Sequence, residues 1–424
     1  MNGPPANRHD AWIALALLAA INVMNYYDRL LVVVVGQPIR AEFGLSDTQY
    51  GLLTGPAFIF VYALSSVTFG WLADRTSRAR LIGVAVGLWS AMTALCGMAQ
   101  NFAMLALARA GIGVGEGGAN PASFSLICDH FPPERRANAI ALFQVGSTIG
   151  MLFSFVLASQ IALAWGWRAT FLLAAVPGLV LAALSLRLLH EPPRGQHDDS
   201  AARPPRGLAA TLGELVANRA FVWLTAAASI GTFSSLGMVV WLPQFFIRYH
   251  GMDQSSVGLL LGPVATLGLI VGIAAGGLAG TRLARRSLVA PVWLCALSNL
   301  ALAPLFVIVL WSGSQVLALV ACCLAMGLAV FYAPSFQATA QTVCAPEQRG
   351  TATAFSNVLN ALIGQGLLVY LIGWLSDRLA PAFGAESLRV AMTLSVATAL
   401  VCGVLFLIAR QHTAARFAGQ ASRA

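Results

Sequence analysis

GWLADRTSR at residues 70–78 and GLAGTRLAR at residues 277–285 are two copies of one loop pattern, G-x3-[DT]-R-x2-R, placed 207 residues apart. A second matched pair, PERRANA at residues 133–139 and PEQRGTA at residues 346–352, has an offset of 213 residues. Because two loops recur at nearly one offset, the chain is predicted to be a duplicated unit. Internal repeats of this kind are typical of membrane transporters.

The composition agrees with a membrane-embedded chain. Of the 424 residues, 58% are hydrophobic and only 10% are charged, whereas average soluble domains carry about 25% charged residues. At about 20 residues per span, the apolar content fills about twelve transmembrane helices. These values exclude a soluble enzyme, a disordered chain and a disulfide scaffold. They also exclude an outer-membrane barrel, whose strands alternate between apolar and polar residues.

Clusters of Arg, Pro, Asp and Gly divide the chain into apolar runs, which we interpret as spans at residues 11–36, 48–72, 81–100, 102–128, 137–164, 168–189, 220–246, 255–280, 287–311, 315–340, 351–375 and 387–409. The polar, Pro-rich segment 190–219 separates six runs from six. We therefore predict an all-α membrane protein with two six-helix bundles. The predicted parts are a first bundle at 1–189, a cytoplasmic linker at 190–219, a second bundle at 220–410 and a cytoplasmic tail at 411–424.

The arginines predict the orientation. All 25 basic residues are Arg, and 18 of them lie in segments on the N-terminal side of the membrane, against 5 on the opposite side. This bias predicts that both termini are cytoplasmic. An Arg-only, Ala-rich chain points to a bacterial genome, so we expect the bacterial inner membrane. Because the basic residues lie in short loops and form no basic domain, we expect no nucleic-acid partner.

The sequence predicts neither a cofactor nor a metal. The seven cysteines lie in or beside apolar runs without metal-type spacing, and we interpret them as small buried hydrophobes. The six histidines lie in loops or at span ends, so none is expected to carry protons inside the membrane. GVGEGG at residues 113–118 matches G-x-G-x-x-G, but it lies in an apolar helix and predicts tight helix packing instead of a nucleotide site.

Four ionisable residues are predicted deep in the spans: Asp28 and Arg29 in the first, and Arg109 and Glu116 in the fourth. Each costs about 2.5–3.5 kcal/mol at a helix centre, so each must be paired or face a cavity. Asp28 and Arg109 both lie roughly 10 Å inside the outer face, at 1.5 Å per residue, which suggests that they pair. Glu116 lies about 10 Å deeper on the same helix face as Arg109.

These residues suggest a mechanism of competition. We hypothesise that Asp28 is the main proton site, that Arg109 binds the anionic head of the cargo, and that Arg29 and Glu116 orient each other and couple the two events. An anion that occupies the arginine leaves the carboxylate without its partner, and protonation becomes easier. The alternative is a static structural network.

Other polar and aromatic side chains are candidates for lining a cavity. Tyr26, Tyr27, Phe58 and Tyr62 are candidates for an acyl-tail path. In the eleventh span, Asn357 and Asn360 share one helix face and point either to a cavity or to a partner helix. A charged first half and a neutral second half favour an amphiphilic cargo.

The stretch GWLADRTSRAR at residues 70–80 resembles the loop 2–3 signature of the major facilitator superfamily. Gly70 permits close helix contact, and Asp74 can pair with Arg75 or Arg78 to hold a gate shut. The alternative is that these arginines only set topology. The second copy has Thr281 in place of Asp74, so no charged gate is predicted there.

A second resemblance is to the Spinster family. It rests on NYYDR at residues 25–29 with Pro38 and FGLS at 43–46, and on LARAGIGVGEG at residues 107–117. It implies twelve helices, alternating access, and a lipid cargo such as a lysophospholipid or sphingosine-1-phosphate. It also implies proton coupling centred on the span-one Asp-Arg pair and the span-four Arg and Glu.

We therefore predict a proton-coupled secondary active transporter of an amphiphilic anion, working as a monomer in the bilayer. The alternatives are a symporter of small organic anions and a multidrug exporter. An enzyme is not expected, because no His-Glu metal site or Ser-His-Asp set falls at membrane depth. A primary pump is not expected either, since the chain has no Lys and hence no P-loop.

Overall fold

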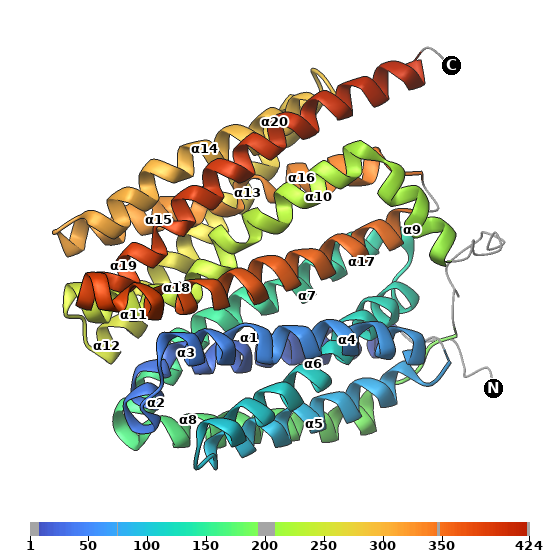
Figure 1. Ribbon diagram of the computed structural model, residues 1–424. Helices are drawn as coiled ribbons and strands as arrows, with labels where there is room; N and C mark the ends of the chain where they lie inside the picture. The colour runs from blue at the N-terminus through green and yellow to red at the C-terminus, as the bar shows by residue number, and fades with distance from the viewer. Residues whose placement is uncertain (1–7, 74, 194–207, 346–347, 422–424) are drawn as a thin grey trace. The chain divides into compact units, whose positions relative to one another are not determined.

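The computed structural model describes residues 8–73, 75–193, 208–345 and 348–421, and every regular element in these ranges is a helix (Figure 1). The chain forms two compact units. Unit 1 comprises Met1–Ala201 and Met252–Pro263, and unit 2 comprises Ala202–Gly251 and Val264–Ala424. The first turns of the eighth predicted span thus pack with the first half of the chain.

In unit 1, α5 packs against both α6 and α8, while α4 packs against α6 and α1 against α7. The elements of unit 1 are α1 (Arg8–Val34), α2 (Gly36–Phe43), α3 (Asp47–Thr54), α4 (Pro56–Ala73), α5 (Arg78–Gly97), α6 (Phe102–His130), α7 (Pro133–Phe153), the π-helix η1 (Ser154–Ala158), α8 (Ser159–Leu188), α12 (Gln254–Ser256) and the π-helix η3 (Val257–Leu261).

In unit 2, α20 packs along α14 and α10, and α14 also packs against α15. The elements are α9 (Leu208–Ala217), α10 (Arg219–Thr232), the π-helix η2 (Phe233–Gly237), α11 (Met238–His250), α13 (Gly262–Ala284), α14 (Ala290–Trp311), α15 (Gln315–Phe331), α16 (Ala333–Thr342), α17 (Arg349–Leu359), the π-helix η5 (Asn360–Leu367), α18 (Leu368–Phe383), the 3-10 helix η6 (Gly384–Glu386), α19 (Ser387–Met392) and α20 (Leu394–Ala421).

Nine helical segments of the described chain are long and apolar enough to cross a membrane. Two of them have 51 and 68 residues, more than twice the roughly 20 residues of one crossing. The backbone of Gly166 (φ 82°) and of Gly384 (φ 55°) turns the chain inside these two segments. The 29-residue α6 is a further candidate that carries several charges. This arrangement is consistent with the twelve predicted spans.

The duplication extends from the loops into the helices. Gly55 ends α3 and Pro56 begins α4, and the same dipeptide recurs at Gly262–Pro263, directly after η3. The offset is again 207 residues. Because proline lacks a backbone N–H and clashes with the preceding turn, it interrupts regular α-helix geometry at these points. In the first copy the helix is interrupted at Gly55, whereas in the second copy the π-helix η3 continues directly into α13.

The segment between the two halves ends in a helix. Most of the predicted linker, at 194–207, lies outside the described residues, but α9 occupies its last part. Leu215 of α9 is buried with Phe221 and Phe406 in the core of unit 2. The predicted tail also begins as helix, since α20 continues to Ala421.

Candidate functional site

The four deep charged residues lie together in unit 1, where α1 supplies Asp28 and Arg29 and α6 supplies Arg109 and Glu116. In all four, the side chain is at most partly exposed. Their formal charges sum to zero. The four side chains of α1 and α6 therefore add no net charge to the interior of the unit.

Glycines of α6 allow its neighbours to come close to this cluster. A Cβ atom at Gly113 would lie 2.7 Å from the carbonyl oxygen of Phe58, and one at Gly117 would lie 2.8 Å from that of Tyr62. On another face, a Cβ atom at Gly115 would lie 2.7 Å from the carbonyl oxygen of Ala85 in α5. The small residues of the GVGEGG stretch thus serve helix packing, as predicted from the sequence.

Arg29 and Glu116 form the ion pair that joins α1 to α6. The Arg29 Nε and Nη2 atoms donate to Glu116 Oε2 at 3.1 and 2.8 Å. The Glu116 side chain is fully buried, whereas the Arg29 side chain is 15% exposed. The expected contact between these two residues is present, and Arg29 is its accessible partner.

Three aromatic rings surround the guanidinium of Arg29. Its Cζ atom lies 5.2 Å from the ring centroid of Tyr26, 5.1 Å from that of Phe58 and 4.9 Å from that of Tyr62. The rings of Phe58 and Tyr62 are themselves stacked, with centroids 5.7 Å apart. Cation–π contacts at this range stabilise a desolvated guanidinium. The rings and Glu116 therefore fix the position of Arg29.

Asp28 and Arg109 are not joined by the ion pair that the depth arithmetic suggested. Asp28 accepts a hydrogen bond from Thr93 Oγ1 of α5 at 3.3 Å. The Arg109 guanidinium instead lies 4.9 Å from the ring centroid of Phe58, and its Nη2 donates to the carbonyl oxygen of Arg29 at 3.5 Å. Equal depth did not produce a contact, because Asp28 is turned towards α5 while Arg109 is drawn to the aromatic ring of α4.

Arg109 and Asp28 are more deeply buried than Arg29. Arg109 is 1% exposed and Asp28 is 0% exposed. The Nε and Nη1 atoms of Arg109 and the Oδ1 atom of Asp28 are buried without a hydrogen-bond partner. Buried polar atoms of this kind are usually satisfied by ordered water. In this conformation neither residue offers a surface to a cargo molecule.

The remaining predicted lining residues divide between the units. Tyr26, Phe58 and Tyr62 join the charged cluster, whereas Tyr27 is buried and is not one of the three rings around Arg29. In unit 2, Asn360 Oδ1 accepts a hydrogen bond from Ser229 Oγ at 2.9 Å, and Asn357 is exposed. Ser229 and Asn360 thus form a neutral polar set in unit 2.

The predicted gating motif contains one buried arginine, Arg78. Its guanidinium contacts Asp129 at the end of α6 at 2.5 Å, Glu191 after α8 at 2.6 Å, and Ser125 Oγ at 2.8 Å. Gly70 lies in α4, but a Cβ atom added there would have no described atom within 4 Å, so the close helix contact predicted for it is not seen. Arg75 is exposed, and Asp74 lies outside the described residues. The acidic partners were missed, although their positions at span ends on the same predicted side were a usable signal.

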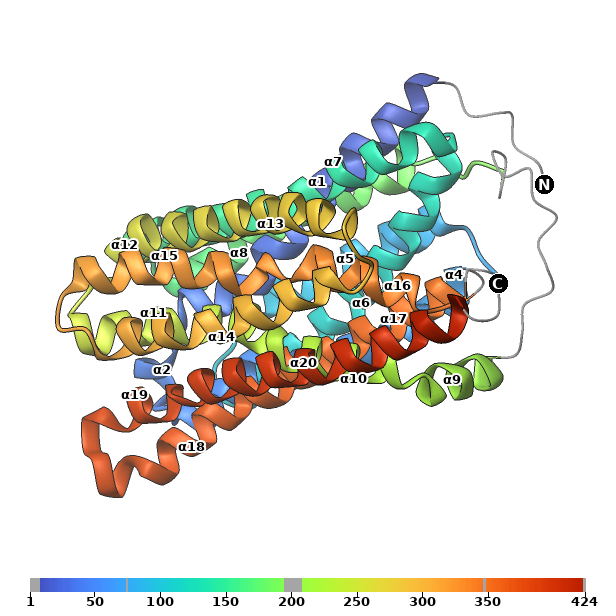
Figure 2. The ribbon, with the colours of Figure 1, turned by 90° about the horizontal axis from the view of Figure 1, so that it is seen from above.

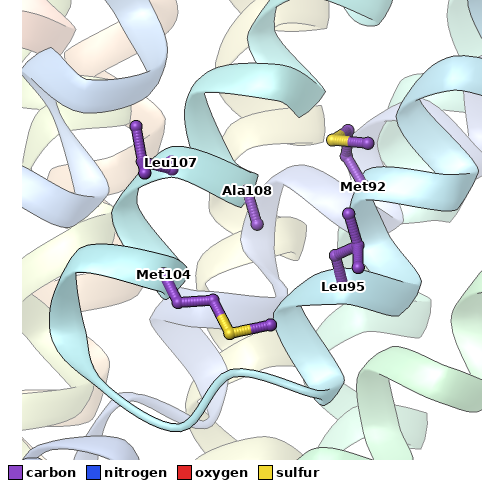
Figure 3. Close-up of a pocket in the computed structure, with 5 residues that line it drawn as sticks. All are labelled: Met92, Leu95, Met104, Leu107 and Ala108. Atoms are coloured by element: carbon purple, nitrogen blue, oxygen red, sulfur yellow. The ribbon is translucent and has the colours of Figure 1, made fainter.

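An apolar cavity of about 360 Å³ lies between α5 and α6, lined by Met92, Leu95, Met104, Leu107 and Ala108 (Figure 3). Ala108 precedes Arg109 in the chain, but no charged side chain lines this cavity. Within the described residues, no three His, Cys, Asp or Glu side chains gather as a metal site.

Known proteins resemble this chain over nearly its whole length. The model of the Major Facilitator Superfamily matches residues 15–366. An MFS-type efflux pump of Mycolicibacterium smegmatis is 30% identical, over 94% of this chain and 93% of that protein. The sphingosine-1-phosphate transporter SPNS2 of Danio rerio is 26% identical, over 94% of this chain and 83% of that protein.

A solved structure agrees with this picture. It is the crystal structure of a bacterial homologue of the human lysosomal transporter Spinster, in an inward-facing and unoccupied conformation. It superposes with a TM-score of 0.88 at 26% identity and covers 97% of this chain and 99% of that one. The chain therefore belongs to the major facilitator superfamily. It is a multi-pass membrane transporter that resembles the Spinster proteins, and it is not an enzyme.

Proposed function

We propose that this transporter couples the movement of an amphiphilic anion, of the lysophospholipid or sphingolipid type, to protons by alternating access. One observation carries the proposal: the ion pair between Arg29 and Glu116. In this pair the guanidinium of Arg29 is partly exposed, whereas the carboxylate of Glu116 is fully buried. A negatively charged head that binds Arg29 competes directly with Glu116.

Competition at Arg29 links cargo and proton. An ionised carboxylate that loses its counter-charge in a dry site is strongly disfavoured. When an anion takes over the guanidinium, Glu116 therefore gains a proton more readily. When the anion leaves, Arg29 returns and the proton is released. The flux of cargo and the flux of protons become linked through one exchange of partners.

The exposure of the side chains refines the roles that the sequence suggested. We assign the first contact with the anion to Arg29, because Arg109 is buried in this conformation. Arg109 remains a candidate for the anion in another state of the cycle. Asp28 remains a proposed proton site in addition to Glu116. The Oδ1 atom of Asp28 is buried without a hydrogen-bond partner and is therefore the oxygen to which we assign the proton.

The aromatic rings support an amphiphilic cargo. Tyr26, Phe58 and Tyr62 place apolar surface next to the guanidinium of Arg29, which suits a molecule with a charged headgroup and an apolar tail. The likeness to a sphingosine-1-phosphate transporter points the same way. The second candidate is export of drugs, which the likeness to an efflux pump favours. The third is symport of small organic anions.

We further propose that the protein lies in the bacterial inner membrane with both termini in the cytoplasm. The support is the distribution of arginines: 18 lie on the side of the N-terminus and 5 on the opposite side. We expect a monomer in which the halves 1–189 and 220–410 are the moving bodies. Loop residues Gly70, Asp74, Arg75 and Arg78 belong to the cytoplasmic gate in this scheme.

Proton uptake by purified protein in liposomes tests the proposal. A pH-sensitive dye trapped inside reports proton movement when a lysophospholipid, a small dicarboxylate or a cationic drug is added outside. We expect the lysophospholipid to move protons, with little effect from the other two. A response to the dicarboxylate alone, or to the drug alone, replaces the lipid proposal with that alternative. Glu116→Gln removes one proposed proton site, and Glu386→Gln, at an exposed surface residue, serves as its matched control.

A further inference from the structure

The connection between α13 and α14 is unusually basic. Residues 282–286 contain Arg282, Arg285 and Arg286, and all three side chains are exposed. In the part of the chain that the structure describes, none of them forms an ion pair with an acidic side chain. We name residues 282–289 the arginine loop.

The matching loop of unit 1 shows what the arginine loop lacks. The offset of 207 residues places Arg285 at the position of Arg78, which is buried against Asp129 and Glu191. At the offset of 213 residues, Thr342 occupies the position of Asp129. The sequence contains no Asp or Glu between Asp253 and Glu347. The second copy thus has the arginines but no acid at the position of Asp129.

A fourth arginine reaches the same end of unit 2. Arg410 of α20 lies with its guanidinium carbon 4.7 Å from the ring centroid of Trp293, near the beginning of α14. The two helices run side by side (Figure 2). The Nε atom of Arg410 is buried without a hydrogen-bond partner. The protein thus holds this guanidinium in place but leaves part of its hydrogen-bonding capacity unused.

Apolar surface accompanies these cations. Leu288 in the arginine loop and Trp293 one turn into α14 are both exposed, at 55% and 40%. Tryptophan is enriched at the headgroup level of membranes, where its ring is apolar and its N–H is wet. A soluble polyanion does not require such apolar neighbours. The combination of cations, an interfacial Trp and an exposed Leu fits a lipid.

We propose that the arginine loop, with Arg410 and Trp293, binds the headgroup of an anionic phospholipid. Guanidinium groups bind phosphate through paired hydrogen bonds, and basic clusters at the ends of transmembrane helices attract anionic headgroups. The charge of the surface is complementary to phosphatidylglycerol and not to a zwitterionic lipid. The proposal depends on the proposed orientation of the protein only in assigning these arginines to the cytoplasmic side of the membrane.

Native mass spectrometry of the full-length protein released from nanodiscs tests this site. Nanodiscs of mixed phosphatidylglycerol and phosphatidylcholine supply the probe, and the bound lipids are counted by mass. We expect wild type to retain phosphatidylglycerol selectively. The triple variant Arg282→Gln, Arg285→Gln, Arg286→Gln is expected to bind it about tenfold or more weakly, because each arginine near the headgroups contributes to the attraction.

The matched control removes the same charge from unit 1. Arg80→Gln, Arg135→Gln, Arg187→Gln neutralises three exposed arginines on the same predicted side, and it should retain the lipid as wild type does. The single variant Arg410→Gln should weaken retention if the triple variant does not fold. Equal loss in both triple variants, or equal retention of the two lipids by wild type, overturns the proposal. Release of the lipid by free glycerol phosphate also overturns it in favour of a soluble ligand.

Discussion

Unit 1 holds four ionisable side chains deep in its helices, whereas unit 2 is uncharged at the matching positions. The offset of 207 residues places Ser235 and Leu236 at the positions of the α1 pair, and the offset of 213 residues places Cys322 and Ala329 at those of the α6 pair. Instead of ion pairs, unit 2 has neutral hydrogen bonds such as Ser229 to Asn360 at 2.9 Å. Two copies of one architecture thus carry different chemistry.

This difference indicates where the proposed coupling resides. A buried ion pair is costly to keep in a membrane and is weak evidence for stability. Its presence in one copy, and its absence from the corresponding positions of the other, indicates a role beyond packing. The neutral copy shows that the architecture itself tolerates small and apolar residues at these sites. The charges of unit 1 are therefore the part of the protein to perturb first.

The largest expected effect comes from breaking the ion pair of unit 1. Arg29→Ala leaves the carboxylate of Glu116 buried without a counter-charge, which costs about 3–5 kcal/mol of stability. We expect a lower midpoint of thermal unfolding in detergent and loss of transport. The double variant Arg29→Met, Glu116→Leu should recover most of the stability, because no charge is left unpaired, but not transport. Recovery of transport in the double variant contradicts a coupling role.

A smaller effect is expected from the glycines that pack α6. Gly113→Val adds atoms where a Cβ atom alone already lies 2.7 Å from the carbonyl oxygen of Phe58. Overpacking of this kind costs about 1–3 kcal/mol and should shift the rings around Arg29. The thermal midpoint and the transport rate should both fall. Gly213→Ala in α9, where no atom lies within 4 Å of the new Cβ, is the control and should lower neither.

The neutral set of unit 2 should respond more weakly. Asn360→Ala removes one of the two acceptors near the Ser229 hydroxyl, the other being the carbonyl oxygen of Thr225, and costs about 1 kcal/mol or less. We expect a moderately higher KM for the cargo and an unchanged ratio of protons to cargo. Parallel measurement of dye response and radiolabelled cargo gives that ratio. A changed ratio would show that unit 2 takes part in coupling, which would contradict the assignment of coupling to unit 1 alone.

The smallest effect is expected at an exposed ion pair of unit 1. Arg168 contacts Glu42 at 2.6 Å, and Trp167 Nε1 donates to the same carboxylate at 2.8 Å. The hydrogen bond from Arg168, followed by that from Trp167, lowers the pKa of Glu42 below its usual range. The stabilisation is therefore present above the pKa of the unfolded chain and is lost as the pH falls through the folded value.

Glu42→Gln should thus lower the stability of the protein by less than about 1 kcal/mol at neutral pH, because both side chains are well exposed to screening. The difference from wild type should vanish in acid and shrink in high salt. Thermal unfolding at several pH values measures it. A difference that grows in acid would contradict the direction of the Glu42 pKa shift.

The helical architecture, the duplication and the family could be predicted because they depend on local signals. Long apolar runs and loops rich in Arg recur along the chain at fixed offsets, and the Gly residues of α6 have a helical spacing that indicates packing. The Arg29–Glu116 contact was also predicted, since both charges must be satisfied at membrane depth. Apart from that contact, which joins residues 87 positions apart in the chain, each of these inferences uses residues close in sequence or matched by one repeat.

The finer geometry depends on side chains from distant segments. Depth arithmetic suggested an Asp28–Arg109 pair, but depth says nothing of rotation, and Asp28 faces Thr93 of α5 instead. The partners of Arg78 come from the ends of α6 and α8, 51 and 113 residues away in the chain. The three rings around Arg29 likewise come from two helices. A single sequence carries no direct signal for such contacts.

Substrate-induced proton uptake by Glu116→Gln in liposomes tests the central claim most directly. The glutamine keeps the size of the side chain and hydrogen-bonding capacity towards Arg29, but it cannot take up a proton. Exchange of labelled lysophospholipid across the membrane measures whether the protein still moves cargo. The account predicts that exchange persists while cargo-driven proton uptake falls strongly, because the carboxylate that competes with the anion for Arg29 is gone and only Asp28 is left as a proton site. Proton uptake equal to that of wild type would contradict it.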